Sequence, residues 1–213
     1  GDWLNAFHPR FQMLHQLFSG IFTFLFRTDG FTGTKLSSLF FYALGVFPFF
    51  ALMREVFTEK IAKFSLLFYL FASRILILGY EGLRESHKML VILLLALGMI
   101  HIVKQSERLK GYIITGIAAG LAVCTRNDMI LFSICILVFC GILDSYRNSI
   151  SWRSLVMFLF AGISAMPEFL VNYWMTGYFI PGARFYFYFK DILHAEPVLS
   201  EVLLKLFPAL LTA

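Results

Sequence analysis

Charged residues are too scarce in this chain for a soluble protein. They make up 15% of the 213 residues, whereas a soluble domain has about 25%. Hydrophobic residues reach 59%, with 26 Phe among them, and the mean hydropathy is +0.77. An ordinary soluble fold cannot hide that much apolar surface. The composition therefore indicates a membrane protein.

Cysteine is also scarce, and its spacing excludes two common kinds of site. The three cysteines, Cys124, Cys135 and Cys140, all lie in apolar segments, and no Cys-x-x-Cys or Cys/His ligand spacing is present. Neither a disulfide framework nor a zinc signature is therefore expected. We expect the three thiols to be buried as small hydrophobic side chains.

The net charge of +5 is typical of a membrane protein with cations near lipid headgroups, so the expected partner is the bilayer and not nucleic acid. No internal repeat or low-complexity linker divides the chain, which predicts one membrane domain over residues 1–213. Gly1 is not an initiator Met, and 198–213 ends within an apolar segment. We expect a piece of a longer protein, truncated at both ends.

Apolar segments follow one another along the whole chain and predict an all-α, polytopic transmembrane helix bundle. They are 11–26, 35–53, 61–79, 89–103, 111–125, 129–143, 154–174 and 198–213. A spanning helix needs about 20 residues, so 89–103 suffices only if 86–88 form its first turn. Segment 11–26 is either a span or a helix lying in the membrane interface.

The stretch 111–143 is too long for one spanning helix. Its 33 residues would reach about 50 Å, against a hydrocarbon core of about 30 Å. The polar residues 125–128 interrupt it, which predicts two short helices joined by a tight turn. Gly116 and Gly120 predict a close helix–helix contact.

If segment 11–26 lies flat, the loops alternate between two faces. Loops 54–60, 104–110 and 144–153 share one face, and loops 27–34, 80–88, 126–128 and 175–192 share the other. Eight Lys and Arg side chains fall on each face, so the positive-inside rule does not orient the chain. The second face nevertheless keeps cations that a translocated face normally lacks, which suggests that something there needs positive charge.

Two polar clusters on the second face are candidate anion sites. The first is the loop that ends in Arg84, His87 and Lys88, which are spaced to share one side of a helix's first turn, where free N–H groups also favour an anion. The second is the turn with Arg126, for phosphate or pyrophosphate, and Asp128, to orient it or a sugar hydroxyl. The plainer interpretations are a solvated loop and an ion-paired turn.

Two further features are weaker candidates. His8, in a polar loop before the first apolar segment, either positions a lipid headgroup or simply marks a helix start beside Pro9. Pro167 and Glu168 lie near the end of 154–174. The plain account is a helix that kinks or ends there, with Glu168 in a cavity as the alternative.

The order of these motifs resembles a known superfamily over residues 7–182. The motifs are His8-Pro9-Arg10-Phe11, Arg54-Glu55-Val56-Phe57, the helix entry at 84–89, Gly120-Leu121-Ala122-Val123-Cys124-Thr125-Arg126, and the spacing of Pro167, Asn172, Gly177 and Pro181. In this order they resemble the dolichyl-phosphate-mannose protein mannosyltransferase superfamily. The bacterial glycosyltransferases of the lipopolysaccharide-core and aminoarabinose type are the most similar members.

The resemblance implies a GT-C-like helix bundle with an extracytoplasmic active site, expected in a bacterial inner membrane. It implies inverting transfer of a sugar from a polyprenyl-phosphate carrier to a hydroxyl of a glycan, lipid or protein acceptor. That chemistry needs a carboxylate base and cations for the departing lipid phosphate. Arg84, Lys88 and Arg126 are the first candidates for phosphate, and His8 and His87 the second. No cofactor is implied with certainty, and a divalent metal ion stays an option.

Two departures from the family pattern affect the prediction. Arg10 stands where the loop motif has its second Pro. The acidic catalytic motif of the family precedes the His-Pro region, and this chain has only Asp2 there. We therefore expect the catalytic base upstream of Gly1 and predict that the isolated chain is inactive.

Two other functions fit a charged polytopic bundle. A transporter or lipid-carrier flippase would place polar residues deep inside several helices, whereas here they concentrate at helix ends. A non-catalytic membrane scaffold would tolerate alanine at Arg84 and Arg126, which the enzyme would not.

Overall fold

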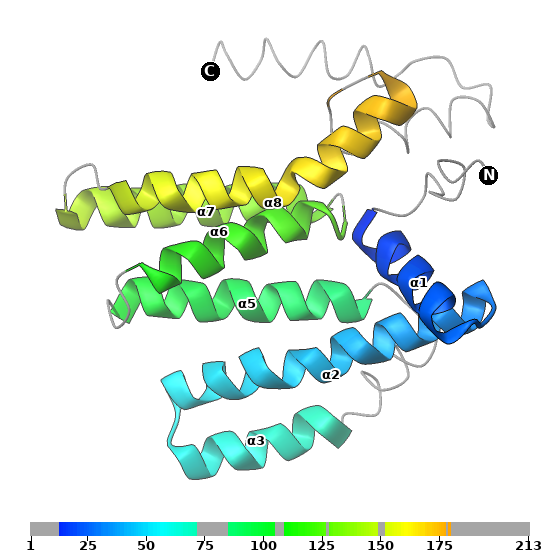
Figure 1. Ribbon diagram of the computed structural model, residues 1–213. Helices are drawn as coiled ribbons and strands as arrows, with labels where there is room; N and C mark the ends of the chain where they lie inside the picture. The colour runs from blue at the N-terminus through cyan, green and yellow to red at the C-terminus, as the bar shows by residue number, and fades with distance from the viewer. Residues whose placement is uncertain are drawn as a thin grey trace.

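The computed structural model describes residues 13–71, 85–104, 109–126, 128–148, 152–177 and 179. Every regular element in this part of the chain is a helix, as predicted. The helices are α1 (Met13–Phe26), α2 (Gly30–Val56), α3 (Glu59–Phe71), α5 (Glu85–Lys104), α6 (Lys110–Val123), α7 (Asp128–Asn148) and α8 (Trp152–Thr176). Figure 1 shows most of them side by side in one bundle.

Four helices, α2, α5, α7 and α8, are long and apolar enough to cross a membrane. The predicted polytopic, all-α membrane bundle is therefore confirmed for the described residues. Helix α5 begins at Glu85, so residues 86–88 do form the first turn that the fourth apolar segment needed. Many large hydrophobic side chains are exposed on the surface of the bundle, among them Phe24, Phe47 and Phe68, as a lipid-facing surface requires.

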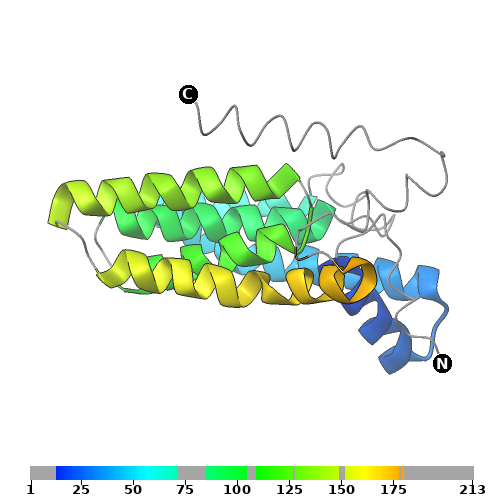
Figure 2. The same ribbon diagram turned by 90° about the horizontal axis from the view of Figure 1, so that it is seen from above.

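The helices are stacked in an order that differs from their order in sequence. In Figure 1, α3, α2, α5 and α6 follow one another, and α7 and α8 close the stack. Figure 2 separates α7 from α8 and places α6 between them. The buried core lies at this join, where α5, α6, α7 and α8 contribute Leu95, Ala118, Cys140 and Met157.

The tight contact between α6 and α8 depends on two glycines. A Cβ atom at Gly116 would collide with the carbonyl oxygen of Met157, and one at Gly120 with that of Ala161. Only a residue without a side chain lets the two backbones approach this closely. The predicted small-residue contact is thus confirmed, and α8 is its partner.

The predicted break at 125–128 is present, but the second helix is not short. Helix α6 has 14 residues, whereas α7 has 21 and continues past residue 143. The polar end of α7 stays helical because its side chains find partners. Asp144 accepts hydrogen bonds from the Tyr112 and Ser154 hydroxyls at 2.7 and 2.6 Å. Arg147 donates to the Val103 carbonyl at 3.0 Å.

Helix α1 is too short to cross the membrane straight. Its 14 residues rise about 21 Å, and Figure 1 shows it crossing the end of α2 obliquely. The choice between a span and an interfacial helix for segment 11–26 stays a prediction, since residues 11–12 lie outside the described part. His15, on the first turn of the helix, is buried at 6% exposure.

Two further expectations concern the cysteines and the end of α8. Cys124 and Cys140 are buried as predicted, but Cys135 is exposed, because it lies on the outer side of α7. Helix α8 continues through Pro167 to Thr176 and does not end there. Figure 1 shows α8 changing direction along this part of its length, so of the two alternatives the kink is correct.

Candidate functional site

A cluster of four charged side chains lies at one end of the bundle, where α5 and α7 begin. We call Glu85, Lys88, Arg126 and Asp128 the charged cluster. Arg126 donates from Nη1 to Glu85 Oε1 at 2.6 Å and from Nε to Asp128 Oδ1 at 2.8 Å. Lys88 Nζ donates to Asp128 Oδ2 at 3.1 Å. Three of the six predicted site residues, Lys88, Arg126 and Asp128, are thus brought together.

Local backbone structure explains how Arg126 reaches this position. Helix α6 ends at Val123, and the Thr125 hydroxyl and the Arg126 amide both donate to the carbonyl of Ala122, at 2.7 and 3.3 Å. The chain turns there, and α7 starts at Asp128. A carboxylate in the first turn of a helix is stabilised by the helix dipole. Asp128 therefore both starts α7 and holds the two cations.

The charged cluster is accessible, and its cations keep donors to spare. The exposed fractions of the four side chains run from 24% for Lys88 to 49% for Asp128. Among the described residues, Nη2 of Arg126 has no hydrogen-bond partner. Burial opposes the charge of Arg126, but the hydrogen bond and charge of Asp128, with those of Glu85, raise its pKa overall. The guanidinium therefore stays charged at any working pH.

His87 does not face the charged cluster, contrary to the prediction that it shares one side with Lys88. It is fully buried between helices, stacked on Phe41 of α2 at 4.0 Å between ring centroids. Its Nε2 lies 3.2 Å from Ser37 Oγ, and the ring of His15 is 5.2 Å away. Neighbouring helix positions point about 100° apart, so His87 points inward where Lys88 points to α7. His8 and Arg84 lie outside the described residues.

A second polar group, only a weak candidate from the sequence, is buried near this end. Glu168 is only 1% exposed, and its carboxylate accepts the backbone N–H of Met13 at 2.9 Å and the Asn172 amide at 2.8 Å. The sequence signal was a carboxylate inside an apolar segment, directly after Pro167. Glu85 was also missed, because its partner Arg126 is 41 residues away.

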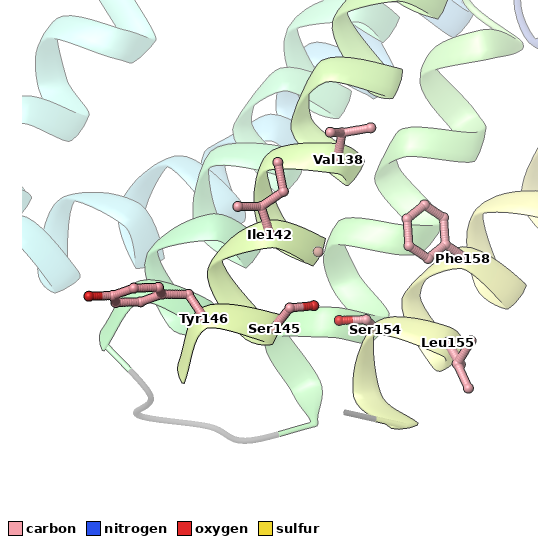
Figure 3. Close-up of a pocket in the computed structure, with 8 residues that line it drawn as sticks. Val138, Ile142, Ser145, Tyr146, Ser154, Leu155 and Phe158 are labelled. Carbon is pink, nitrogen blue, oxygen red and sulfur yellow. The ribbon is translucent and has the colours of Figure 1, made fainter. Parts of the chain in front are cut away.

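The opposite end of the bundle has a different feature, a groove between α7 and α8. It encloses about 690 Å³ and is lined mainly by apolar side chains, as Figure 3 shows, with Ser145, Tyr146 and Ser154 at its polar margin. The groove is formed by residues of α7 and α8 alone and includes none of the charged cluster. The residues that line the groove therefore include no charged side chain that would bind a phosphate.

The described residues contain no group of three His, Cys, Asp or Glu side chains that could hold a metal ion. Within these residues, the charged cluster is the arrangement best suited to bind a ligand. Its two cations are held by carboxylates, so an anion would meet donors that are already in position. The donors that Lys88 and Arg126 do not use within the charged cluster are of the kind that bind an anion.

Comparison with known proteins gives one match. The family model for dolichyl-phosphate-mannose-protein mannosyltransferase matches residues 8–204, a longer region than the 7–182 that the motifs cover. No curated protein and no solved structure gives a significant match. Because the match spans nearly the whole chain and includes the charged cluster, the chain belongs to the dolichyl-phosphate-mannose-protein mannosyltransferase family of membrane glycosyltransferases.

Proposed function

We propose that the protein transfers a sugar, with inversion, from a polyprenyl-phosphate donor to a hydroxyl acceptor outside the cytoplasm. Lys88 and Arg126 bind the phosphate of the donor, and Glu85 and Asp128 hold these cations in place. The observation that carries the proposal is the charged cluster at one end of a bundle that belongs to this family.

The geometry supports phosphate binding in a specific way. Arg126 turns its Nε and Nη1 toward carboxylates, which leaves Nη2 for a ligand. Lys88 keeps two of its three ammonium protons for a ligand, because its hydrogen bond to Asp128 uses one. A phosphate that docks here gains charge-assisted hydrogen bonds from pre-positioned donors. Arg84 directly precedes the charged cluster in sequence and is proposed as a third cation.

The proposed orientation and membrane are those that the family resemblance implies. The charged-cluster end faces away from the cytoplasm, in a bacterial inner membrane, and the acceptor is a glycan, lipid or protein hydroxyl. His87 is proposed as a neighbour that supports α5 rather than as a phosphate ligand, because its ring is fully buried.

The distribution of polar groups favours this function over transport. In the described part of the bundle, buried Asp144 lies near the end of α7, and buried Glu168 lies beside the start of α1. Among the described residues, the buried polar side chains in the middle of α6 and α7 are neutral hydroxyls, those of Thr115 and Ser133. A flippase or transporter would be expected to carry charge along a passage through the middle.

The test is binding of undecaprenyl phosphate to the purified chain in lipid nanodiscs, with undecaprenol as the phosphate-free control lipid. Lys88→Ala should weaken binding of the phosphate about tenfold, because one charge-assisted hydrogen bond is lost. Lys63→Ala is the matched control. Lys63 is also paired with a carboxylate, Glu59 at 2.7 Å, but it lies on α3 outside the charged cluster.

Preference for the phosphate over undecaprenol, lost in Lys88→Ala and kept in Lys63→Ala, would support the proposal. Equal binding of both lipids, or equal effects of the two variants, would overturn it. Retention of binding in Arg84→Ala and Arg126→Ala together would favour the non-catalytic scaffold.

A further inference from the structure

Helix α1 packs along α2, with Phe18 against Phe41 for example, and its first three residues also contact other parts of the bundle. Met13 donates its backbone N–H to Glu168 of α8 at 2.9 Å. Leu14 donates its N–H to the carbonyl of Cys124 at 3.1 Å. His15 packs its ring against that of His87 of α5. One turn of α1 therefore touches three other elements.

Two of these three contacts involve residues close in sequence to the charged cluster. Cys124 is two residues before Arg126, and His87 directly precedes Lys88. The first turn of α1 is thus packed both against the turn that carries Arg126 and against the helix turn that carries Lys88. A shift of α1 would change the separation of the two cations.

Glu168 is suited to hold this turn. The first turn of α1 has no acidic residue of its own to complement the positive end of the helix dipole. Glu168 supplies a carboxylate from 155 residues away. The amide of Asn172, one turn along α8, bonds the second oxygen at 2.8 Å and so fixes the carboxylate.

We propose that Glu168 is a positioning residue, which holds the N-terminus of α1 and thereby sets the spacing of Lys88 and Arg126 for the donor phosphate. This inference rests on the proposed function for its last step. The docking of α1 by Glu168 is independent of that function. The carboxylate itself is buried, so its role is to position other groups.

The carboxylate of Glu168 and the backbone N–H of Met13 can be altered separately. Glu168→Gln keeps an oxygen but removes the charge, and it turns an N–H donor toward either Met13 or Asn172. Met13→Pro removes only the N–H that Glu168 accepts, and Pro is well tolerated at the first position of a helix. Met13→Ala keeps that N–H and is the control for Met13→Pro. Glu59→Gln, at an exposed carboxylate of α3, is the control for Glu168→Gln.

Two measurements are made on the chain in nanodiscs. Hydrogen exchange reports on the docking of α1, and the dissociation constant for undecaprenyl phosphate reports on the charged cluster. We expect Glu168→Gln and Met13→Pro each to raise exchange in the peptide beginning at Leu14 about tenfold, and to weaken binding several-fold. The double variant should be no worse than the singles, because both remove one interaction. Both controls should match the wild type.

The outcomes separate the two proposals. Faster exchange at α1 with unchanged phosphate binding would overturn the positioning role, as would equal effects of Met13→Ala and Met13→Pro. Faster exchange throughout α2 and α3 would mean general unfolding and would also overturn it. If Lys88→Ala leaves phosphate binding unchanged, the proposed function fails, and exchange alone decides whether Glu168 docks α1.

Discussion

The two ends of the bundle both carry charged side chains, but they use them differently. At the opposite end, cations bond to backbone carbonyls: Arg147 to Val103, and Lys104 to Glu55, whose carboxylate it also contacts at 3.2 Å. These bonds satisfy the free carbonyl groups at helix C-termini. In the charged cluster, Lys88 and Arg126 bond only to carboxylates among the described residues.

This difference separates structural charge from charge that a ligand can use. A cation that caps a helix cannot leave without exposing a carbonyl. A cation held by a carboxylate can share its donors with an incoming anion. The even division of Lys and Arg between the two faces therefore conceals two roles, and a count of charges could not distinguish them.

The most damaging change should be one that separates α6 from α8 beside the charged cluster. Gly120→Leu forces a side chain into the backbone of α8, and we expect a loss of more than about 3 kcal/mol in the free energy of unfolding, with little folded protein recovered. Gly162→Leu is the control, because a Cβ there meets no atom within 4 Å. Thermal unfolding in detergent measures both. Equal stability of the two variants would contradict the close contact.

At the opposite end, Asp144→Ala should reduce stability by about 2–4 kcal/mol, because the buried Tyr112 hydroxyl and the half-buried Ser154 hydroxyl lose their acceptor. Asp144→Asn should lose less, since its amide still accepts one hydrogen bond and the Ser154 hydroxyl can accept from the amide nitrogen. Neither should alter binding of undecaprenyl phosphate in the protein that remains folded. Loss of phosphate binding in the folded Asp144 variants would contradict the distinction between the two ends of the bundle.

Arg126→Ala should change binding of undecaprenyl phosphate, which the Asp144 variants leave unaltered. It removes donors that the proposal gives to the phosphate, and we expect the dissociation constant for undecaprenyl phosphate to rise about 10- to 100-fold. Arg147→Ala, at the opposite end, should cost stability without changing that constant. The comparison is made by titration of nanodiscs at fixed ionic strength, because binding to exposed cations weakens with salt.

The smallest effect should come from the start of α2. Asp29 caps this helix, and hydrogen bonds from the Thr32 side chain and then its backbone N–H hold the Asp29 pKa below the ordinary 3.8. A lowered folded pKa contributes stability above pH 3.8, and that stability is lost as the pH falls through the folded value. As the pH falls through this range, the Tm of the wild type should drop by roughly a degree or two more than the Tm of Asp29→Asn. Parallel Tm curves would show that the cap does not titrate.

Much of the fold was predictable because the membrane restricts the choices. Apolar length identified α2, α5 and α8 as candidate spans, and the cost of burying charge placed the break at 125–128. Gly116 and Gly120 predicted a close contact by their spacing alone. The extent of α7 was not predictable, because it depends on Tyr112 and Ser154, which lie on other helices.

The direction of side chains around a membrane helix was less predictable. Helix α5 is apolar on every side, since both its lipid-facing and its core-facing residues are hydrophobic, so its sequence shows no stripe from which the inward face could be read. His87 was therefore assigned to the wrong side. Partners far apart in sequence, such as Glu85 with Arg126 and Glu168 with Met13, are fixed only by how the helices pack.

The length of α5 has a consequence for how a carrier lipid meets the protein. Its 20 residues rise about 30 Å, the thickness of the hydrocarbon core, and Glu85 and Lys88 lie in its first turn. The charged cluster is therefore level with the boundary between acyl chains and headgroups, where a lipid phosphate already sits. Exposing a carrier's chain to water would cost about 0.8 kcal/mol per methylene. On the proposed function, the donor would approach by sideways diffusion within its own leaflet, at no such cost.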